Sequence, residues 1–197
     1  MIEIFQTFGS GLTGALGAPM LPLLPALVAW AVAAPRAVYV PAGFAASFAL
    51  GFAALNAGSG WLIDSADPGA VVAGLAIAAY GLNAMGALRM PFANAAAPFL
   101  GFAFAFGWAP MPSAALAVAV DSGFAATAAY GAGLAVFAWL ANPVLSRVSR
   151  RIFSREPVFA KLAGMTLFAT GLAIAAGLFA ELGFALDATF PALRNLG

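Results

Sequence analysis

The segment "GALGAPMLPLLPAL", residues 14–27, decides the fold because it places three prolines inside an apolar run. A proline removes one backbone donor, and its ring clashes with the carbonyl group one helical turn earlier. Pro19, Pro22 and Pro25 therefore predict a helix that is kinked or unwound near its middle. In lipid, irregular backbone survives only where it is buried in protein or lines a wet cavity. This break should face the centre of a helical bundle.

The same device occurs a second time. "FGWAPMPSAALAVAV", residues 106–120, repeats Ala-Pro-Met 91 residues further along, so that Met111 corresponds to Met20. Three more prolines interrupt this part of the chain: Pro98, Pro110 and Pro112. The sequence therefore predicts two broken helices, each with a methionine at its break.

The composition predicts an all-α integral membrane protein. The 197 residues are 64% hydrophobic and 8% charged, and the mean hydropathy is +1.01. This leaves too little polar surface to cover a soluble globule. Six apolar segments are each long enough to cross a bilayer as a helix. They cover about residues 8–32, 38–63, 69–88, 94–120, 123–146 and 159–186.

The charges predict how the helices are oriented. Basic residues occupy alternate connections, at Arg36, at Arg89 and in the cluster Arg147, Arg150, Arg151, Arg155 and Lys161. Six of the seven acidic residues occupy the opposite connections, at Glu3, Asp64, Asp67, Asp121, Glu181 and Asp187, where Arg194 is the one basic residue. Because basic loops stay in the cytoplasm, both termini should be extracytoplasmic in a multi-pass protein of the cell's inner (plasma) membrane. The basic cluster is interpreted as a topology determinant beside anionic headgroups, with no nucleic-acid partner.

The chain lacks the residue types that several kinds of chemistry require. The predicted helix interiors carry no acidic or basic side chain, which argues against a proton relay or a hard-cation pathway. There is no His for haem or imidazole ligation and no Cys for a disulfide or thiolate. "GSGLTG", residues 9–14, matches a dinucleotide fingerprint only formally, because the required strand is missing. No cofactor is expected.

Six helices with a break in the first and fourth predict a 3+3 repeat within one membrane domain, residues 1–197. The repeats would cover about residues 1–90 and 91–197. Since three is odd, the second trio enters from the opposite side, and the repeat is inverted. Such folds place a site at the midplane and move one half against the other. Met20 and Met111 would face each other there.

At Pro19-Met20-Leu21-Pro22 and Gly107-Trp108-Ala109-Pro110-Met111 the chain resembles the CcdA family, whose fold is shared by the membrane domain of DsbD. That family carries Pro-Cys-x-x-Pro in its first helix and Gly-Trp-Thr-Pro-Cys in its fourth. The spacing to the second proline is one residue shorter here unless Leu23 to Pro25 supplies it. The basic loop followed by "AKLAGMTLFATGLAIAAG", residues 160–177, also resembles the family's last loop and helix.

The resemblance implies a thiol-disulfide relay that carries reducing equivalents from cytoplasmic thioredoxin to extracytoplasmic proteins, including those of cytochrome c biogenesis. The implied redox positions are Met20 and Met111, where the family has cysteine. A thioether neither forms nor attacks a disulfide, so whether this chain is an enzyme stays open. The implied partners are the bilayer and thioredoxin-like proteins on either side.

Three interpretations of the paired methionines remain. The chain is a non-redox relative or altered form that keeps the scaffold, or a Cu(I) permease with thioether ligands, or a site of reversible methionine oxidation. In the copper interpretation Met20 and Met111 are the metal ligands, and Met85 and Met165 could complete the site. Buried methionine is otherwise an adaptable apolar filler.

Other residues have structural interpretations. Gly14, Gly17, Gly101 and Gly107 are expected at hinges or close helix contacts, beside the break residues Pro19, Pro22 and Pro110. The amides of Asn56, Asn83 and Asn142 are expected to bond across helices or to cap a backbone carbonyl freed near a kink such as that at Pro143. Trp30 and Trp61 are predicted to be anchors at the membrane interface, and Trp108 to pack beside the fourth-helix break.

Overall fold

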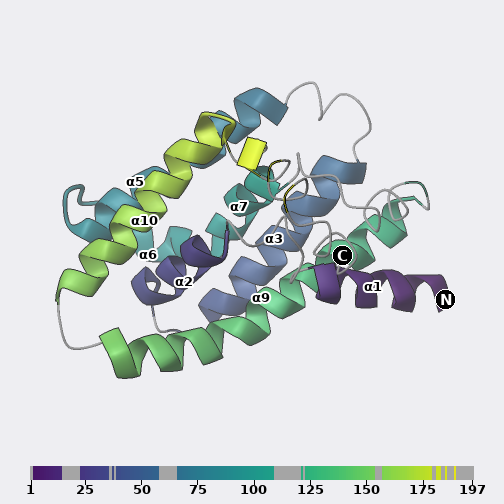
Figure 1. Ribbon diagram of the computed structural model, residues 1–197, viewed down its shortest axis with the longest axis horizontal. Coiled ribbons are helices and arrows are strands. Elements are labelled where there is room, and N and C mark those ends of the chain that lie inside the picture. Colours follow the sequence, from purple (N-terminus) through teal and green to yellow (C-terminus); the bar gives the residue numbers. More distant parts are fainter. Residues whose placement is uncertain are drawn as a thin grey trace.

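A computed structural model describes residues 2–14, 23–35, 37, 39–57, 66–108, 121, 123–153, 157–178, 181–182, 185 and 189. Every element in this part of the chain is a helix (Figure 1). In chain order the helices are α1 (Ile2–Gly14), α2 (Leu24–Ala33), α3 (Tyr39–Ala57), α5 (Ala66–Met85), α6 (Ala93–Ala96), η2 (Ala97–Phe99), α7 (Leu100–Trp108), α9 (Phe124–Phe153) and α10 (Pro157–Ala175).

Each of these helices overlaps one of the six predicted segments, although α1 begins at Ile2, ahead of the predicted start near residue 8. The first segment holds α1 and α2, and the stretch between them, residues 15–22, is outside the described part. The fourth holds α6, η2 and α7, and so changes from α-helix to 3₁₀-helix at Pro98. Among the described residues, two helices are long and apolar enough to cross a membrane, over Pro68–Met85 and Val158–Ala175. Apolar helices of shorter length are Leu24–Ala33, Tyr39–Leu55, Ala93–Phe106 and Phe124–Val136.

Two predicted helix ends were wrong. The fifth helix was expected to stop near residue 146, but α9 continues to Phe153 and takes in three arginines of the basic cluster. Arginine is a good helix former, so the charges end the apolar stretch without ending the helix. The sixth was expected to reach residue 186, but α10 ends at Ala175. Gly177 has a φ of +72°, and this left-handed conformation terminates the helix.

The end of α5 explains the sharp turn that follows it. Gly86 has a φ of +79°, its N–H donates to Asn83 O at 3.0 Å, and the N–H of Ala87 donates to Leu82 O at 3.0 Å. This is a Schellman ending, in which a left-handed glycine satisfies the last free carbonyls. The Asn83 side chain then accepts a hydrogen bond of 2.9 Å from the N–H of Met90. The connection from α5 to α6 is therefore held by backbone and amide groups.

The helices in close contact form a ring. α5 packs along α10, and α3 packs along α9. On one side α2 contacts α10 and α9, and α1 contacts α9. On the other side α7 contacts α5 and α3, and η2 contacts α3. Each of these pairs joins a helix from residues 1–90 to one from residues 91–197, so the two halves of the chain are interleaved.

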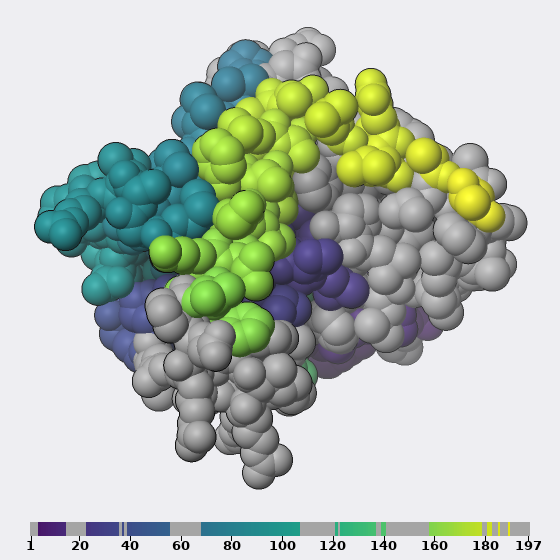
Figure 2. Space-filling model, turned by 60° about the vertical axis from the view of Figure 1, so that its left-hand side comes forward, coloured from purple at the N-terminus to yellow at the C-terminus, as the bar shows by residue number. Residues whose placement is uncertain are grey.

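Small residues let α5 and α10 approach closely. A Cβ added to Gly74 would meet the carbonyl oxygen of Gly171, and one added to Gly171 would meet that of Gly74. Gly81 and Gly164 are related in the same reciprocal way, because a Cβ added to either one would lie 2.6 Å from the carbonyl oxygen of the other. Because higher numbers on α5 meet lower numbers on α10, the two helices are antiparallel. Figure 2 shows α10 lying across this face of the molecule beside the segment that leads from α5 to α6.

This interface has an internal register of 90 residues. The residues of α5 at the contact are Gly74, Ala78, Gly81 and Met85, and those of α10 are Gly164, Phe168, Gly171 and Ala175. Each member of the second set lies 90 positions after one member of the first. Burial follows the same register, since Ala73 and Ala163, Ile77 and Leu167, and Tyr80 and Thr170 are buried pairs. The two helices therefore present matching faces to each other and to the core.

The core is rich in aromatic rings carried by α3. Phe44, Phe48 and Phe52 recur every four residues and are buried, so they lie on one face of the helix. The ring of Trp30 lies 4.0 Å from that of Phe44, centroid to centroid. The ring of Tyr130 lies 5.7 Å from that of Phe52. These contacts bind α2 and α9 to α3.

Large apolar side chains also cover the outside. Val72 on α5 is 69% exposed, Leu50 on α3 is 68% exposed and Phe99 in η2 is 70% exposed. Burying such side chains in an apolar environment is favourable, and contiguous exposed apolar surface marks contact with a membrane or another protein. The molecule therefore buries apolar residues inside and exposes them outside.

Candidate functional site

The described part of the fourth segment is irregular at Pro98, where three helices meet. Pro98 is buried, and its carbonyl oxygen accepts a hydrogen bond of 2.7 Å from the Ser47 hydroxyl on α3. The preceding carbonyl, that of Ala97, accepts a bond of 3.3 Å from Trp30 Nε1 on α2. A 3₁₀ turn leaves carbonyl groups without their α-helical partners. Here, side chains from two other helices supply the donors.

This geometry corrects the prediction for Trp30. An anchor at the membrane interface should be half exposed, but Trp30 is 2% exposed and its ring lies tilted against that of Phe44. Its position near the end of a predicted segment did not reveal which side of the helix it occupies. Trp61 and the side chain of Trp108 lie outside the described part.

Glycines make a second close crossing, between α1 and α9. Gly11 lies against the backbone of Tyr130, and Gly133 lies against the backbone of Phe8 and Leu12. A Cβ on Gly14 would fall 2.5 Å from the Tyr130 hydroxyl oxygen. The expectation of close packing at Gly14 is confirmed. Gly101 is also confirmed, because a Cβ there would meet the carbonyl oxygen of Phe44 and, at 2.5 Å, Ser47 Oγ.

Most residues of the predicted site lie outside the described part of the chain. These are Met20, Met111, Pro19, Pro22, Pro110 and Gly17. Gly107 lies within α7, next to its last residue, Trp108. The structure therefore gives the elements that flank the two Ala-Pro-Met segments, namely α1 and α2 around the first and α7 before the second.

The two additional methionines do not meet in the core. Met165 is 56% exposed on the outer face of α10. Met85 is half-buried, with its Cγ against the backbone position of Gly164. A sulfur site at the bundle centre needs inward-facing thioethers, so the suggestion that Met165 completes such a site was wrong. Met85 fills the space beside a glycine.

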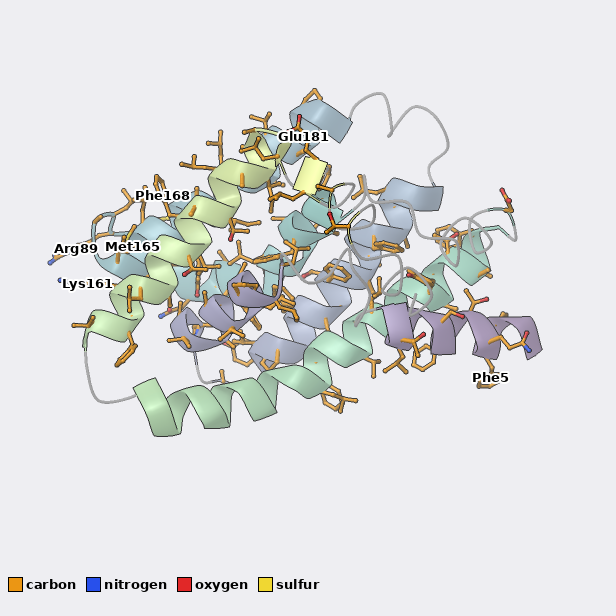
Figure 3. All side chains as sticks on the ribbon, viewed as in Figure 1. Phe5, Arg89, Lys161, Met165, Phe168 and Glu181 are labelled. Atoms are coloured by element: carbon orange, nitrogen blue, oxygen red, sulfur yellow. The ribbon has the colours of Figure 1, made fainter. Side chains whose placement is uncertain are left out.

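Charged side chains separate along the α5 and α10 pair. Figure 3 shows Arg89 and Lys161 at one end of the two helices and Glu181 near the other. The two basic residues are exposed, and in the described part of the chain neither forms an ion pair. The end with the cations is the end where α5 stops and α10 begins. The separation agrees with the charge alternation seen along the sequence.

The functional groups among the described residues are suited to holding other groups in place by hydrogen bonds. They contain no cluster of three His, Cys, Asp or Glu side chains that could hold a metal ion. The polar residues that they bury are Ser47, Thr127 and Thr170, and the buried aromatic residues Trp30, Tyr80 and Tyr130 also carry a polar group. Asn83 accepts a hydrogen bond from the backbone N–H of Met90 in the following turn, and does not make the predicted cross-helix bond or contact with a freed carbonyl. The side chains of Asn56 and Asn142 are not described. Ser47, Tyr80 and Thr170 were not singled out from the sequence.

Comparison of the chain with known protein families, curated proteins and solved structures found no match.

Proposed function

We propose that the chain is a six-span membrane protein built as a 3+3 inverted repeat. The observation that carries this proposal is the order of helices around the ring. If residues 1–90 and 91–197 are exchanged, the contact of α3 with α7 becomes the contact of α9 with α1 and α2. The contact of α5 with α7 becomes the contact of α10 with α2. The two remaining pairs, α5 with α10 and α3 with α9, exchange within themselves.

The directions of the helices support the same proposal. In Figure 1, α5 and α9 run from right to left, whereas α3, α7 and α10 run from left to right. This is the alternation expected of consecutive spans that share a membrane. The 90-residue register of the α5 and α10 interface agrees closely with the 91-residue offset between Pro19 and Pro110. Packing and sequence thus point to one internal duplication.

The proposed setting is the inner (plasma) membrane, with both termini extracytoplasmic. Exposed side chains such as Val72, Leu50 and Phe99 would contact acyl chains. The end that carries Arg89 and Lys161 would face the cytoplasm, because basic residues are retained on that side. Lipid is then the partner that covers the apolar exterior.

The proposed activity is that of a CcdA-like scaffold for transmembrane reductant transfer in cytochrome c biogenesis, which does not itself exchange thiols. The Ala-Pro-Met segments occupy the places of the family's cysteine elements, and their methionines exclude disulfide chemistry. What remains is an alternating-access frame on which thioredoxin-like proteins would dock. Every pair of neighbouring helices in the ring joins residues 1–90 to residues 91–197, so moving these two halves apart would break all of these contacts. Any such motion must therefore move helices from both halves together.

Restoring the dithiol tests this proposal. The double variant Met20→Cys and Met111→Cys should form a disulfide that reduced thioredoxin can open, because the two breaks are proposed to meet at mid-depth. A disulfide needs Cα atoms within about 7 Å of each other. The single variants, each with one cysteine, are the controls. A pair that stays reduced under oxidant, or that thioredoxin leaves untouched, contradicts the CcdA-like assignment.

The alternative proposal is a Cu(I) permease that uses Met20 and Met111. Its support is the duplication of methionine at equivalent breaks, because thioethers are soft ligands suited to Cu(I). The outward position of Met165 restricts this site to the two repeated methionines and groups near them.

A further inference from the structure

Tyr80 on α5 and Thr170 on α10 occupy equivalent positions, 90 residues apart, on the core-facing side of their helices. Tyr80 is 3% exposed and Thr170 is 8% exposed. On α5, Tyr80 follows the buried residues Ala73 and Ile77 at helical spacing. On α10, Thr170 lies between the buried residues Leu167 and Ile174. All four of these apolar residues belong to the hydrophobic core. A hydroxyl therefore interrupts the same apolar face on each helix.

Neither hydroxyl has a hydrogen-bond partner in the part of the chain that the structure describes. The contrast with other threonines is direct. Thr13, Thr127 and Thr166 each approach the carbonyl oxygen four residues earlier, at 3.3, 3.1 and 3.0 Å. Thr170 has no such bond, so its hydroxyl is not satisfied by its own helix. A buried hydroxyl without a partner is unfavourable, and more so where no bulk water is present.

The hydroxyl oxygens of Tyr80 and Thr170 keep part of the small remaining exposure of these residues. Among the described residues, every side-chain nitrogen or oxygen that is fully sealed from solvent has a partner. The unpartnered oxygens of Tyr80 and Thr170 are therefore not sealed, although the residues that carry them are more than nine-tenths buried. Each oxygen reaches a space that a water molecule can touch.

The two hydroxyls lie close in height along the helix pair. Gly171, which follows Thr170, lies against the backbone nitrogen of Ala78, two residues before Tyr80. At 1.5 Å of rise per residue, the two positions differ by roughly one helical turn at most. Both residues lie on the core side of this crossing. A single small polar ligand can therefore be approached from both helices.

We propose that Tyr80 and Thr170 hold ordered water between them on the inner side of the α5 and α10 crossing. A water offers two donors and two acceptors, which matches two hydroxyls with unused capacity, and buried waters typically bridge such groups. The proposed water site is independent of thiol or copper chemistry. It would give the otherwise apolar core one hydrated point on the axis that relates the two repeats.

Radiolytic hydroxyl-radical labelling with mass spectrometry tests the site in the full chain, reconstituted in lipid nanodiscs. Radicals formed from a bound water modify the side chain beside it. Tyr130 is the internal control, since it is the same residue type and is 1% exposed. Tyr80 should be modified at least about fivefold faster than Tyr130, as expected of a ring whose hydroxyl contacts water. Equal rates for the two tyrosines would overturn the proposal.

Variants on α10 separate a bound water from simple leakage of solvent. Thr170→Val removes the second hydroxyl at nearly constant volume and should lower Tyr80 modification at least about threefold. Thr170→Ser should preserve it, and Thr166→Val should not change it, because the Thr166 hydroxyl is satisfied by Leu162. If Thr170→Val leaves the labelling of Tyr80 unchanged, the two residues do not share a water. Each variant must first show the unfolding midpoint of the parent chain within a few degrees. If Thr170→Val does not, Thr170→Ala, which also removes the hydroxyl, carries the test.

Discussion

The Ser47 hydroxyl donates a hydrogen bond of 2.7 Å to the carbonyl oxygen of Pro98, and so joins α3 to the 3₁₀ turn between α6 and α7. The bond crosses from the first half of the chain to the second. Together with the bond from Trp30 Nε1 to Ala97 O, it satisfies the backbone where the fourth segment loses its α-helical pattern. Buried irregular backbone requires such donors.

Ser47→Ala should destabilise the fold. The change leaves the buried carbonyl of Pro98 without its donor, which costs about 1–3 kcal/mol in free energy of unfolding. Thr13→Ala is the control, because that hydroxyl is exposed and bonds only within its own helix. Unfolding in detergent micelles measures both. Equal stabilities of the two variants would show that the Ser47 bond contributes nothing.

Gly171→Ala should weaken the pairing of α5 and α10. The added Cβ falls against the backbone of Ala78 and Gly74, and because backbone cannot move aside, the helices must separate at a cost of about 2 kcal/mol. Gly9→Ala is the same substitution on α1 with open space around it, and it should be neutral or stabilising. The midpoint of thermal unfolding distinguishes them. The close approach would be refuted by a Gly171→Ala variant as stable as Gly9→Ala.

Substitutions at Gly86 should follow backbone preference. Its φ of +79° is tolerated by asparagine but strained for a β-branched residue. Gly86→Val should therefore cost roughly 1–2 kcal/mol more in free energy of unfolding than Gly86→Asn. No neighbour lies within 4 Å of a Cβ at this position, so crowding does not confuse the comparison. The reverse order of stability would mean that the turn is not left-handed.

The copper alternative makes its own prediction. Vesicles that contain the protein should accumulate copper under reducing conditions, and Met20→Leu or Met111→Leu should abolish the uptake because each removes a thioether ligand. Met165→Leu is the matched control, since that side chain is 56% exposed on the outside of α10. Atomic absorption of washed vesicles gives the readout. Undiminished transport by the Met20 and Met111 variants would exclude the copper proposal, so that only the scaffold proposal would remain.

The sequence predicted the helical elements better than their lateral arrangement. Apolar length located the helices, and Pro98 marked a real change to 3₁₀ geometry. Hydropathy does not specify which face of an apolar helix turns inward, so Trp30 was misplaced. Ser47 gave no signal, because a single serine in an apolar run is ordinary.

One sequence pattern did indicate that α5 and α10 pack against each other. Gly-Leu-Ala-Ile-Ala-Ala occurs at residues 74–79 and again at 171–176, and the glycines that begin the two copies touch each other. Small residues at such spacing favour close helix contact. Their reciprocal geometry could not be read from the sequence, because it depends on the crossing point and antiparallel direction of two distant helices.

The most direct test of the six-span inverted repeat is side-specific labelling of single cysteines, since the natural chain has none. In intact bacterial cells, an impermeant maleimide should label Asp121→Cys and Leu182→Cys but should reach Leu88→Cys only after permeabilisation. All three positions are exposed. One predicted span separates Leu88 from Asp121. The helices α9 and α10, the second of which ends at Ala175, separate Asp121 from Leu182. Labelling of Leu88→Cys and Asp121→Cys from the same side of the membrane would contradict the proposed fold.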